Sequence, residues 1–464
     1  MPRPPLYKGS PAGILFLALG ALLCTTSLLR ASGQTNVPVA MKNGPLAGRD
    51  SAVTAKDSTV TVKDSTVTVI DTTVVPLIAV SPDSVTAAVD TSRAEEAHPQ
   101  DAPVDRGFLI RTSDGSAELR LLGSIRLTAL FDFNGLQTTS SFNTYAIPVG
   151  EENVDERRFE MNAQETRLGV EVTRRTGLGD IFVKVETDFL GSSGTLRLRH
   201  AYGTFMGFLF GQTWSTFGDP TSIPLTVDLD GPNSSVSTRT VQIRYNSQID
   251  SALTWAAAIE SPSLEVSIPD SLGLDPPFQS FPDIIARIRQ GGTWGHLQLA
   301  GILRSITMRN PTGELDALTG MGFLVSGRFF LGGERPHRIL YQLDAGKGIS
   351  RFITALSGED LDLVYNPATQ SFDLTSSVGT YVSYAREWTP SLMSYFTVGW
   401  ISLGNIQDRP DDAFKQSMYV SANLFWDPAP GLRLGGEYSW GRRENKDGAY
   451  GTANRISAVL RYDF

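Results

Sequence analysis

The chain has 464 residues, of which 41% are hydrophobic and 19% charged, and it contains a single Cys. One Cys excludes a disulfide scaffold and a Cys-rich zinc site, and a formal charge of −9 argues against a nucleic-acid binder, which carries a basic excess. A mean hydropathy of −0.10 excludes a bundle of long apolar helices but is compatible with a transmembrane barrel, whose strands are apolar only at alternate positions.

Residues 1–33 have the pattern of a secretory signal peptide. Arg3 and Lys8 precede a short apolar run over 13–24, and small residues follow at 31–33 as a cleavage pattern. A membrane anchor is the alternative, but the apolar run is too short to span a bilayer comfortably. We therefore expect an exported protein whose mature chain contains no Cys.

Residues 34–105 are rich in Thr, Val, Asp, Ser and Ala, and a seven-residue repeat (DSAVTAK, DSTVTVK, DSTVTVI) runs over 50–70. Thr and Val are poor helix formers, so this period does not indicate a coiled coil. Two interpretations stay open, an extended or disordered spacer and an oligomeric stalk. In both, the low-complexity segment lies in the periplasm.

From about residue 115 the chain becomes a series of segments of alternating polarity, separated by Gly, Pro, Asn and Asp. Sixteen segments fit this pattern: 117–133, 163–173, 179–190, 195–206, 207–214, 240–246, 251–260, 282–290, 293–306, 319–331, 337–346, 376–387, 391–403, 416–427, 431–442 and 452–464. They predict an all-β fold, a sixteen-stranded antiparallel transmembrane β-barrel over 106–464 that follows the signal peptide and the Thr/Val-rich repeat spacer.

Three features favour a membrane barrel over a secreted soluble β-protein. Aromatic residues such as Trp426, Tyr438 and Tyr462 stand on the apolar face near segment ends, as interfacial girdles require. Short and long connections alternate, and the number of segments is even. A spanning sheet must close on itself, because hydrocarbon offers no partner to an unpaired backbone group.

Several stretches of the sequence resemble those of known protein families. The stretch LRLRHAYGTFMGFLFGQTWSTFGD over 196–219, followed by RTVQIRYN over 239–246, resembles the DcaP-like porin family, and DIFVKVETDF over 180–189 matches the same pattern. The terminal RISAVLRYDF over 455–464 resembles the assembly signal of bacterial outer-membrane proteins. We take both as a resemblance in local sequence.

The resemblance implies a homotrimeric diffusion porin in the lipid of a Gram-negative outer membrane, with small anionic solutes such as dicarboxylates. It also implies that the barrel assembly machinery recognises Phe464. Members of the family can carry a helical coiled-coil segment before the barrel. The Thr/Val-rich repeat departs from that pattern, which puts a helical stalk in doubt.

The loop over 215–238 is the best candidate for a pore constriction, because it is long and follows a short strand; an ordinary outer loop is the alternative. Its acids would form one side of the constriction: Asp219, Asp228 and Asp230. Strand parity points a set of arginines inward as the opposite wall, where they would grip carboxylates: Arg167, Arg197, Arg199, Arg244, Arg287 and Arg289. The alternative is a structural role, in which such arginines pair with wall acids such as Glu186 and Asp188.

Enzymatic activity is not expected. His296 has lumen parity but no partner that the sequence reveals, and His200 falls on the apolar parity of its strand. No cluster has metal-ligand spacing and no cofactor motif is present, so we expect neither metal nor cofactor. The alternative function is an envelope-tethering barrel, whose N-terminal stalk binds cell wall or a periplasmic partner.

Overall fold

A computed structural model describes residues 59–62, 65–70, 98–99, 107–133, 136, 141–150, 157–268, 276–309, 315–332, 337–366, 371–404 and 409–464. The predicted signal peptide and most of the repeat spacer lie outside these described residues. Within them, no helix is long and apolar enough to cross a membrane.

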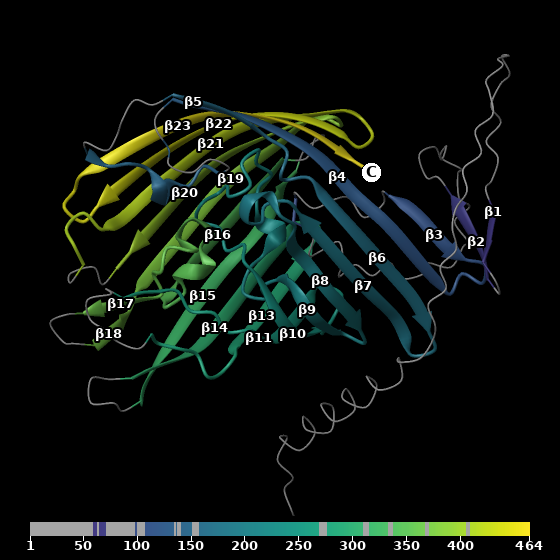
Figure 1. The fold of residues 1–464 in the computed structure, drawn as a ribbon, viewed down its shortest axis with the longest axis horizontal. Coiled ribbons are helices and arrows are strands. Elements are labelled where there is room, and N and C mark those ends of the chain that lie inside the picture. Colours follow the sequence, from purple (N-terminus) through teal and green to yellow (C-terminus); the bar gives the residue numbers. More distant parts are fainter. Residues whose placement is uncertain are drawn as a thin grey trace, which may run out of the picture. The chain divides into compact units, whose positions relative to one another are not determined.

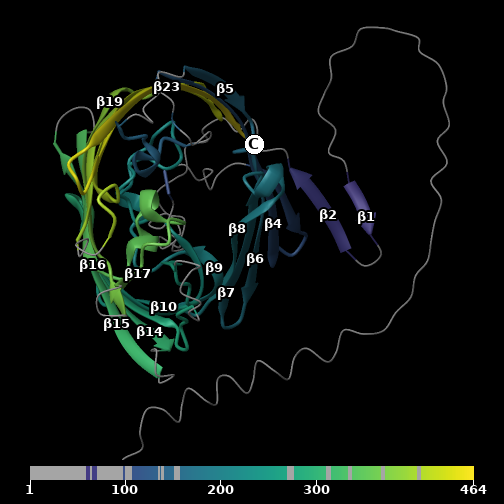
Figure 2. The same cartoon turned by 60° about the vertical axis from the view of Figure 1, so that its left-hand side comes forward.

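Sixteen strands form one closed antiparallel barrel (Figures 1 and 2). They are β4 (Ala117–Asp132), β6 (Arg167–Thr176), β7 (Gly179–Asp188), β8 (Arg197–Phe205), β9 (Phe208–Trp214), β10 (Arg239–Gln248), β11 (Leu253–Glu260), β13 (Asp283–Gly292), β14 (Gly295–Arg309), β15 (Leu315–Leu331), β16 (His337–Lys347), β19 (Ser376–Thr389), β20 (Leu392–Leu403), β21 (Phe414–Ala429), β22 (Leu432–Asn445) and β23 (Tyr450–Asp463). Each pairs with the next, and β23 pairs with β4. The prediction of a sixteen-stranded barrel is confirmed, and every predicted segment overlaps one of these strands.

Seven shorter strands were not among the predicted segments. On β4, β3 (Phe108–Thr112) pairs with the first residues and β5 (Arg158–Asn162) with the last. Within the repeat, β1 (Thr59–Val62) pairs with β2 (Ser65–Ile70), which pairs with β3. A small separate sheet joins β12 (Val266–Ser267), β17 (Leu363–Asn366) and β18 (Ser371–Leu374), all from two long connections. These additions leave the barrel itself unchanged.

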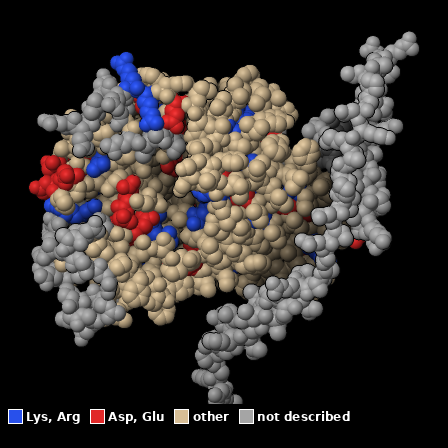
Figure 3. All heavy atoms as spheres, viewed as in Figure 1, with Lys and Arg blue, Asp and Glu red and all other residues tan. Residues whose placement is uncertain are grey.

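The barrel has apolar side chains outside and polar side chains inside. On β10, Val241 and Ile243 are 52% and 49% exposed, whereas Gln242 and Arg244 are 3% and 2% exposed. Figure 3 shows charged side chains gathered mainly towards the left of that view, while uncharged residues cover most of the right half of the barrel surface. This polarity is the reverse of that of a soluble protein and suits a lipid surround.

A bulge in β8 interrupts the expected alternation. A register shift between Glu186 and Thr187 of β7 places an extra residue, Arg199, in β8. His200 then pairs with Glu186, whose side chain is inward, and both are buried. The expected apolar parity of His200 is therefore wrong, because a bulge turns two successive side chains to the same face.

The barrel closes where the last residue meets β4. The N–H groups of Phe464 and Gly123 each donate to the other residue's carbonyl oxygen at 3.0 Å. A Cβ on Gly123 would lie 2.7 Å from the Arg167 carbonyl oxygen and 2.7 Å from the Phe464 ring. The closing seam therefore has no room for a side chain at residue 123.

Replacing Gly123 with Ala should destabilise the barrel by about 1–3 kcal/mol, the usual cost of overpacking a tight site. The measurement is the urea midpoint of unfolding in detergent micelles. Gly436→Ala is the matched control, because a Cβ on Gly436 has nothing within 4 Å. Equal midpoints for the two variants would contradict the tight-seam explanation.

Candidate functional site: a constriction loop and a basic cavity

The loop over 215–238 lies inside the barrel. Its residues 215–228 and 231–236 are buried throughout. Phe217 and Val236 pack against inward side chains of β13, β14 and β15, whereas Leu225 and Val227 pack against those of β16, β19, β20, β21 and β23. Since these strands lie on different parts of the wall, the loop crosses the lumen, as a constriction loop must.

Asp219 fixes the start of the loop to the wall. Its carboxylate accepts from the Arg289 guanidinium at 2.6 Å, from His296 Nε2 at 2.7 Å and from the Ser326 hydroxyl at 2.9 Å. Burial alone would raise the pKa of Asp219, but Arg289 and His296 outweigh it and hold the pKa well below its usual range. Asp219 is therefore an ionised anchor shared by three neighbouring strands.

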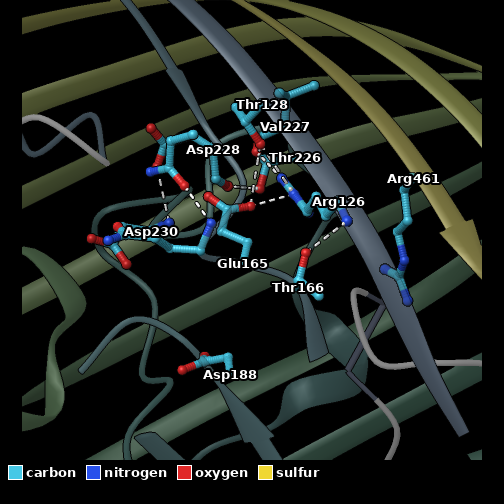
Figure 4. A network of polar contacts seen from close by, with 12 residues as sticks. Arg126, Thr128, Glu165, Thr166, Asp188, Thr226, Val227, Asp228, Asp230 and Arg461 are labelled. Atoms are coloured by element: carbon cyan, nitrogen blue, oxygen red, sulfur yellow. Dashed lines mark hydrogen bonds and ion pairs between the residues drawn. The ribbon is translucent and has the colours of Figure 1, made fainter. Parts of the chain in front are cut away.

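Asp228 forms a second anchor, at the part of the loop where Arg126 of β4 donates to the carbonyl oxygen of Val227 (Figure 4). It accepts from the Phe142 N–H at 2.5 Å and lies 3.5 Å from the Arg455 guanidinium. Glu437 of β22 accepts the N–H groups of Val227 and Asp228 at 2.9 and 3.1 Å. The loop is thus held near its start and near its middle, because each anchor joins a carboxylate to wall donors or loop N–H groups.

Arg304 of β14 holds two further connections, 261–282 and 348–375. Its guanidinium lies 2.9 Å from Asp362 and 3.3 Å from Asp283, and it donates to the carbonyl oxygens of Gly348 and Ser263. The side chain is fully buried. Sequence parity would have found Arg304, because it shares the inward face of β14 with His296.

Glu265 links these two connections. Its carboxylate accepts the Gly358 N–H at 2.8 Å, and its own N–H donates to Asp362 at 3.3 Å. Burial raises the pKa of Glu265 to about 7, with repulsion from Asp362 adding to the effect and the Gly358 N–H opposing it. Near neutral pH, the contact between the two loops therefore depends on a proton.

A cavity of about 440 Å³ lies between the constriction loop and the strands β6 to β10. Four arginines line it, against two acids: Arg167, Arg197, Arg199 and Arg239, with Glu165 and Asp230. Trp214, at the end of β9, contributes an aromatic wall, and the Arg239 guanidinium carbon lies 4.2 Å from its ring centroid. The cavity is therefore basic with one aromatic face.

Buried carboxylates stand behind two of these arginines. Arg197 binds Asp188 through two N–H groups, at 3.0 and 2.7 Å, and Arg199 lies 2.7 Å from Glu186 and 3.3 Å from Asp188. The Asp188 and Glu186 side chains are only 1% exposed, whereas that of Arg197 is 41% exposed. A solute in the cavity meets the guanidinium of Arg197 rather than the carboxylates.

The predicted site residues fall into three groups. Arg167, Arg197, Arg199 and Asp230 meet in the cavity; Asp219, Asp228 and Arg289 hold the loop; Arg244 and Arg287 lie elsewhere on the wall, the first buried and the second donating to Asn246 at 3.5 Å. Sequence reasoning missed Arg239 and Trp214, although both flank the loop directly.

The cavity and loops contain the groups of a filter rather than those of a metal centre. In the described part of the chain, no group of three or more His, Cys, Asp and Glu residues could hold a metal ion. A closed sixteen-stranded barrel with an apolar exterior, a polar interior and an inward-folded loop defines an outer-membrane channel of the porin class.

The model of the DcaP outer membrane protein family matches residues 110–464, and the chain belongs to this family. It is therefore a channel protein and not an enzyme, which confirms that prediction and the resemblance. No curated protein sequence matches the chain.

Two solved structures share the fold. The outer membrane channel DcaP of Acinetobacter baumannii is 22% identical with a TM-score of 0.67, and the match covers 76% of this chain and 99% of that one. An anion-selective porin from Comamonas acidovorans is 8% identical with a TM-score of 0.50, covering 75% of this chain and all of that one.

Replacing Asp219 with Asn should loosen the constriction loop, because the variant leaves Arg289 buried without its counter-charge. The local cost is at most about 3–5 kcal/mol, the range for breaking a buried pair. Single-channel recordings should show larger current fluctuations, and amides over 215–238 should exchange faster. Asp180→Asn, which removes an exposed carboxylate from the start of β7, is the control. Identical recordings for both variants would show that Asp219 does not anchor the loop.

The contact between the loops at 261–268 and 357–362 should weaken as pH rises. The pKa of Glu265 in the folded protein lies above its ordinary value of 4.5. The contribution of Glu265 to the stability of this contact is therefore complete below pH 4.5 and is lost as pH rises through about 7. Amide hydrogen exchange in these loops, corrected for intrinsic rates, should become faster as pH rises through about 7. The variant Glu265→Gln should lack this pH dependence. Glu118→Gln on β4 should keep the wild-type profile; a profile unchanged in Glu265→Gln would refute the role of Glu265.

Proposed function

We propose that the chain is a passive diffusion channel for small anionic solutes such as dicarboxylates, which pass the basic cavity beside the constriction loop. The observation that carries this proposal is the contrast in exposure between Arg197 and the carboxylates of Asp188 and Glu186 behind it. Guanidinium groups remain charged at any physiological pH and bind carboxylates through two parallel hydrogen bonds.

The pairing with wall acids does not remove this capacity. A guanidinium has five N–H donors, and the bond with Asp188 uses two of those of Arg197. The paired acids position the arginines, so a solute finds donors already oriented. Asp230 is the acid that faces the same cavity from the loop, and it limits how tightly an anion is held.

The comparisons support the same class of solute. One structure that shares the fold is an anion-selective porin, and the DcaP-like resemblance implies small anions. On the same resemblance we propose a homotrimer in the outer-membrane lipid, exported through the signal peptide at 1–33 and assembled through recognition of Phe464. The spacer over 34–105 then lies in the periplasm, apart from His98, which lines the cavity.

The test is the double variant Arg197→Gln/Arg199→Gln in planar bilayers under a salt gradient. The wild-type reversal potential should favour anions, and the double variant should lower the anion-to-cation permeability ratio on the order of twofold, because two charges leave a constriction narrower than a Debye length.

The matched control removes two exposed arginines at the turn between β6 and β7, in Arg174→Gln/Arg175→Gln. This variant should keep the wild-type reversal potential. A cation preference in the wild-type protein would overturn the proposed function. An equal change of the reversal potential in the two double variants would show that the cavity arginines do not set the anion preference.

A further inference from the structure

His98 lies inside the barrel, although it precedes the barrel strands in sequence. Its ring stacks on Trp214, with centroids 5.1 Å apart and ring planes at 23°. His98 is 7% exposed and lines the same cavity as the four arginines and Asp230. An imidazole from the end of the spacer therefore occupies part of the candidate site.

Trp214 serves as the platform for this contact. His200 meets the Trp214 ring edge-on at 5.6 Å and 68°, and the Arg239 guanidinium carbon lies 4.2 Å from the same ring. Aromatic pairs of this kind contribute about 0.5–1.5 kcal/mol beyond the burial of their surface. The wall holds Trp214 in place, and the ring of His98 packs on its face.

The length of chain between His98 and the barrel agrees with this placement. Phe108 begins β3, which pairs with β4 at the end where the short turns lie. Ten residues separate the two positions in the sequence, so the chain reaches at most about 33–36 Å between them. β6 also has ten residues, and it runs from Arg167 at the cavity to Thr176 at the same short-turn end.

We propose that His98 is a tethered occupant of the basic cavity, so that the His98 side chain narrows the pore where anionic solutes pass. The inference rests on the proposed function for the route of the solute. The imidazole stacks on the face of Trp214, and the wall arginines and Asp230 line the cavity around it. Solutes therefore cross the cavity beside the ring or after displacing it.

The experiment uses the full chain with Cys24→Ser, into which His98→Cys is introduced, and records current across a planar bilayer. The probe is 2-sulfonatoethyl methanethiosulfonate, a small anionic thiol reagent. Modification at position 98 should reduce the current, because it adds bulk and negative charge to the cavity. Thr112→Cys, on the exposed strand β3, is the control and should leave the current unchanged when modified.

A second variant tests the same occupancy without a reagent. His98→Ala should raise single-channel conductance on the order of 1.5-fold, since a constriction limits flow by its open cross-section; His337→Ala on β16 should not. Unchanged current after modification of His98→Cys, or an equal loss in Thr112→Cys, would overturn the inference. The reversal potential of the unmodified protein is measured in the same membranes. If it favours anions, such a result overturns the role of His98 alone and leaves the proposed function standing.

Discussion

The need to pair every backbone N–H and C=O group in a hydrocarbon surround governs the whole structure. A flat sheet would leave two unpaired edges, so the sixteen strands must close, and they do so where β23 meets β4. The two reciprocal hydrogen bonds between Gly123 and Phe464 complete this seam at the last residue of the chain. Once the sheet is closed, each strand has one face towards lipid and one towards the lumen, and the alternation of the sequence follows directly.

Closure also leaves a wide lumen, which the inward-folded loops partly fill. A sixteen-stranded barrel is too wide to be filled by the side chains of its own wall and leaves an aqueous channel. Here long connections, 215–238 and 348–375 among them, fold inward and bring their own apolar residues, such as Phe217 and Phe352, against apolar patches of the inner wall. Buried ion pairs at Asp219 and Arg304 set where those segments lie. Apolar contact keeps the loops inside, and directional charge pairing fixes their position.

The sequence predicted the barrel well because a period of two is a strong signal when repeated sixteen times. It failed at β8, where the bulge at Arg199 shifts parity within a strand and turns His200 inward. It identified the loop over 215–238 and three of the cavity arginines, but assigned Asp219 to the pore rather than to the wall. Parity states which face a side chain occupies, whereas the partner of a loop carboxylate depends on the fold of the loop. Arg239 was not predicted because it is the first residue of β10, just outside the segment 240–246 in which the alternation was recognised.

The net charge of the chain differs from the charge that a solute meets in the pore. The formal charge of −9 counts Asp188 and Glu186 equally with Arg197 and Arg199. In the folded barrel the two carboxylates are 1% exposed and the Arg199 side chain 3% exposed, whereas the Arg197 side chain is 41% exposed. The Arg197–Asp188 pair is therefore neutral as a sum but presents its cationic member to the cavity. Selectivity in such a pore depends on which member of each ion pair faces the water. An acidic chain can therefore present a basic surface to a solute by burying a carboxylate behind an exposed arginine, as Asp188 lies behind Arg197.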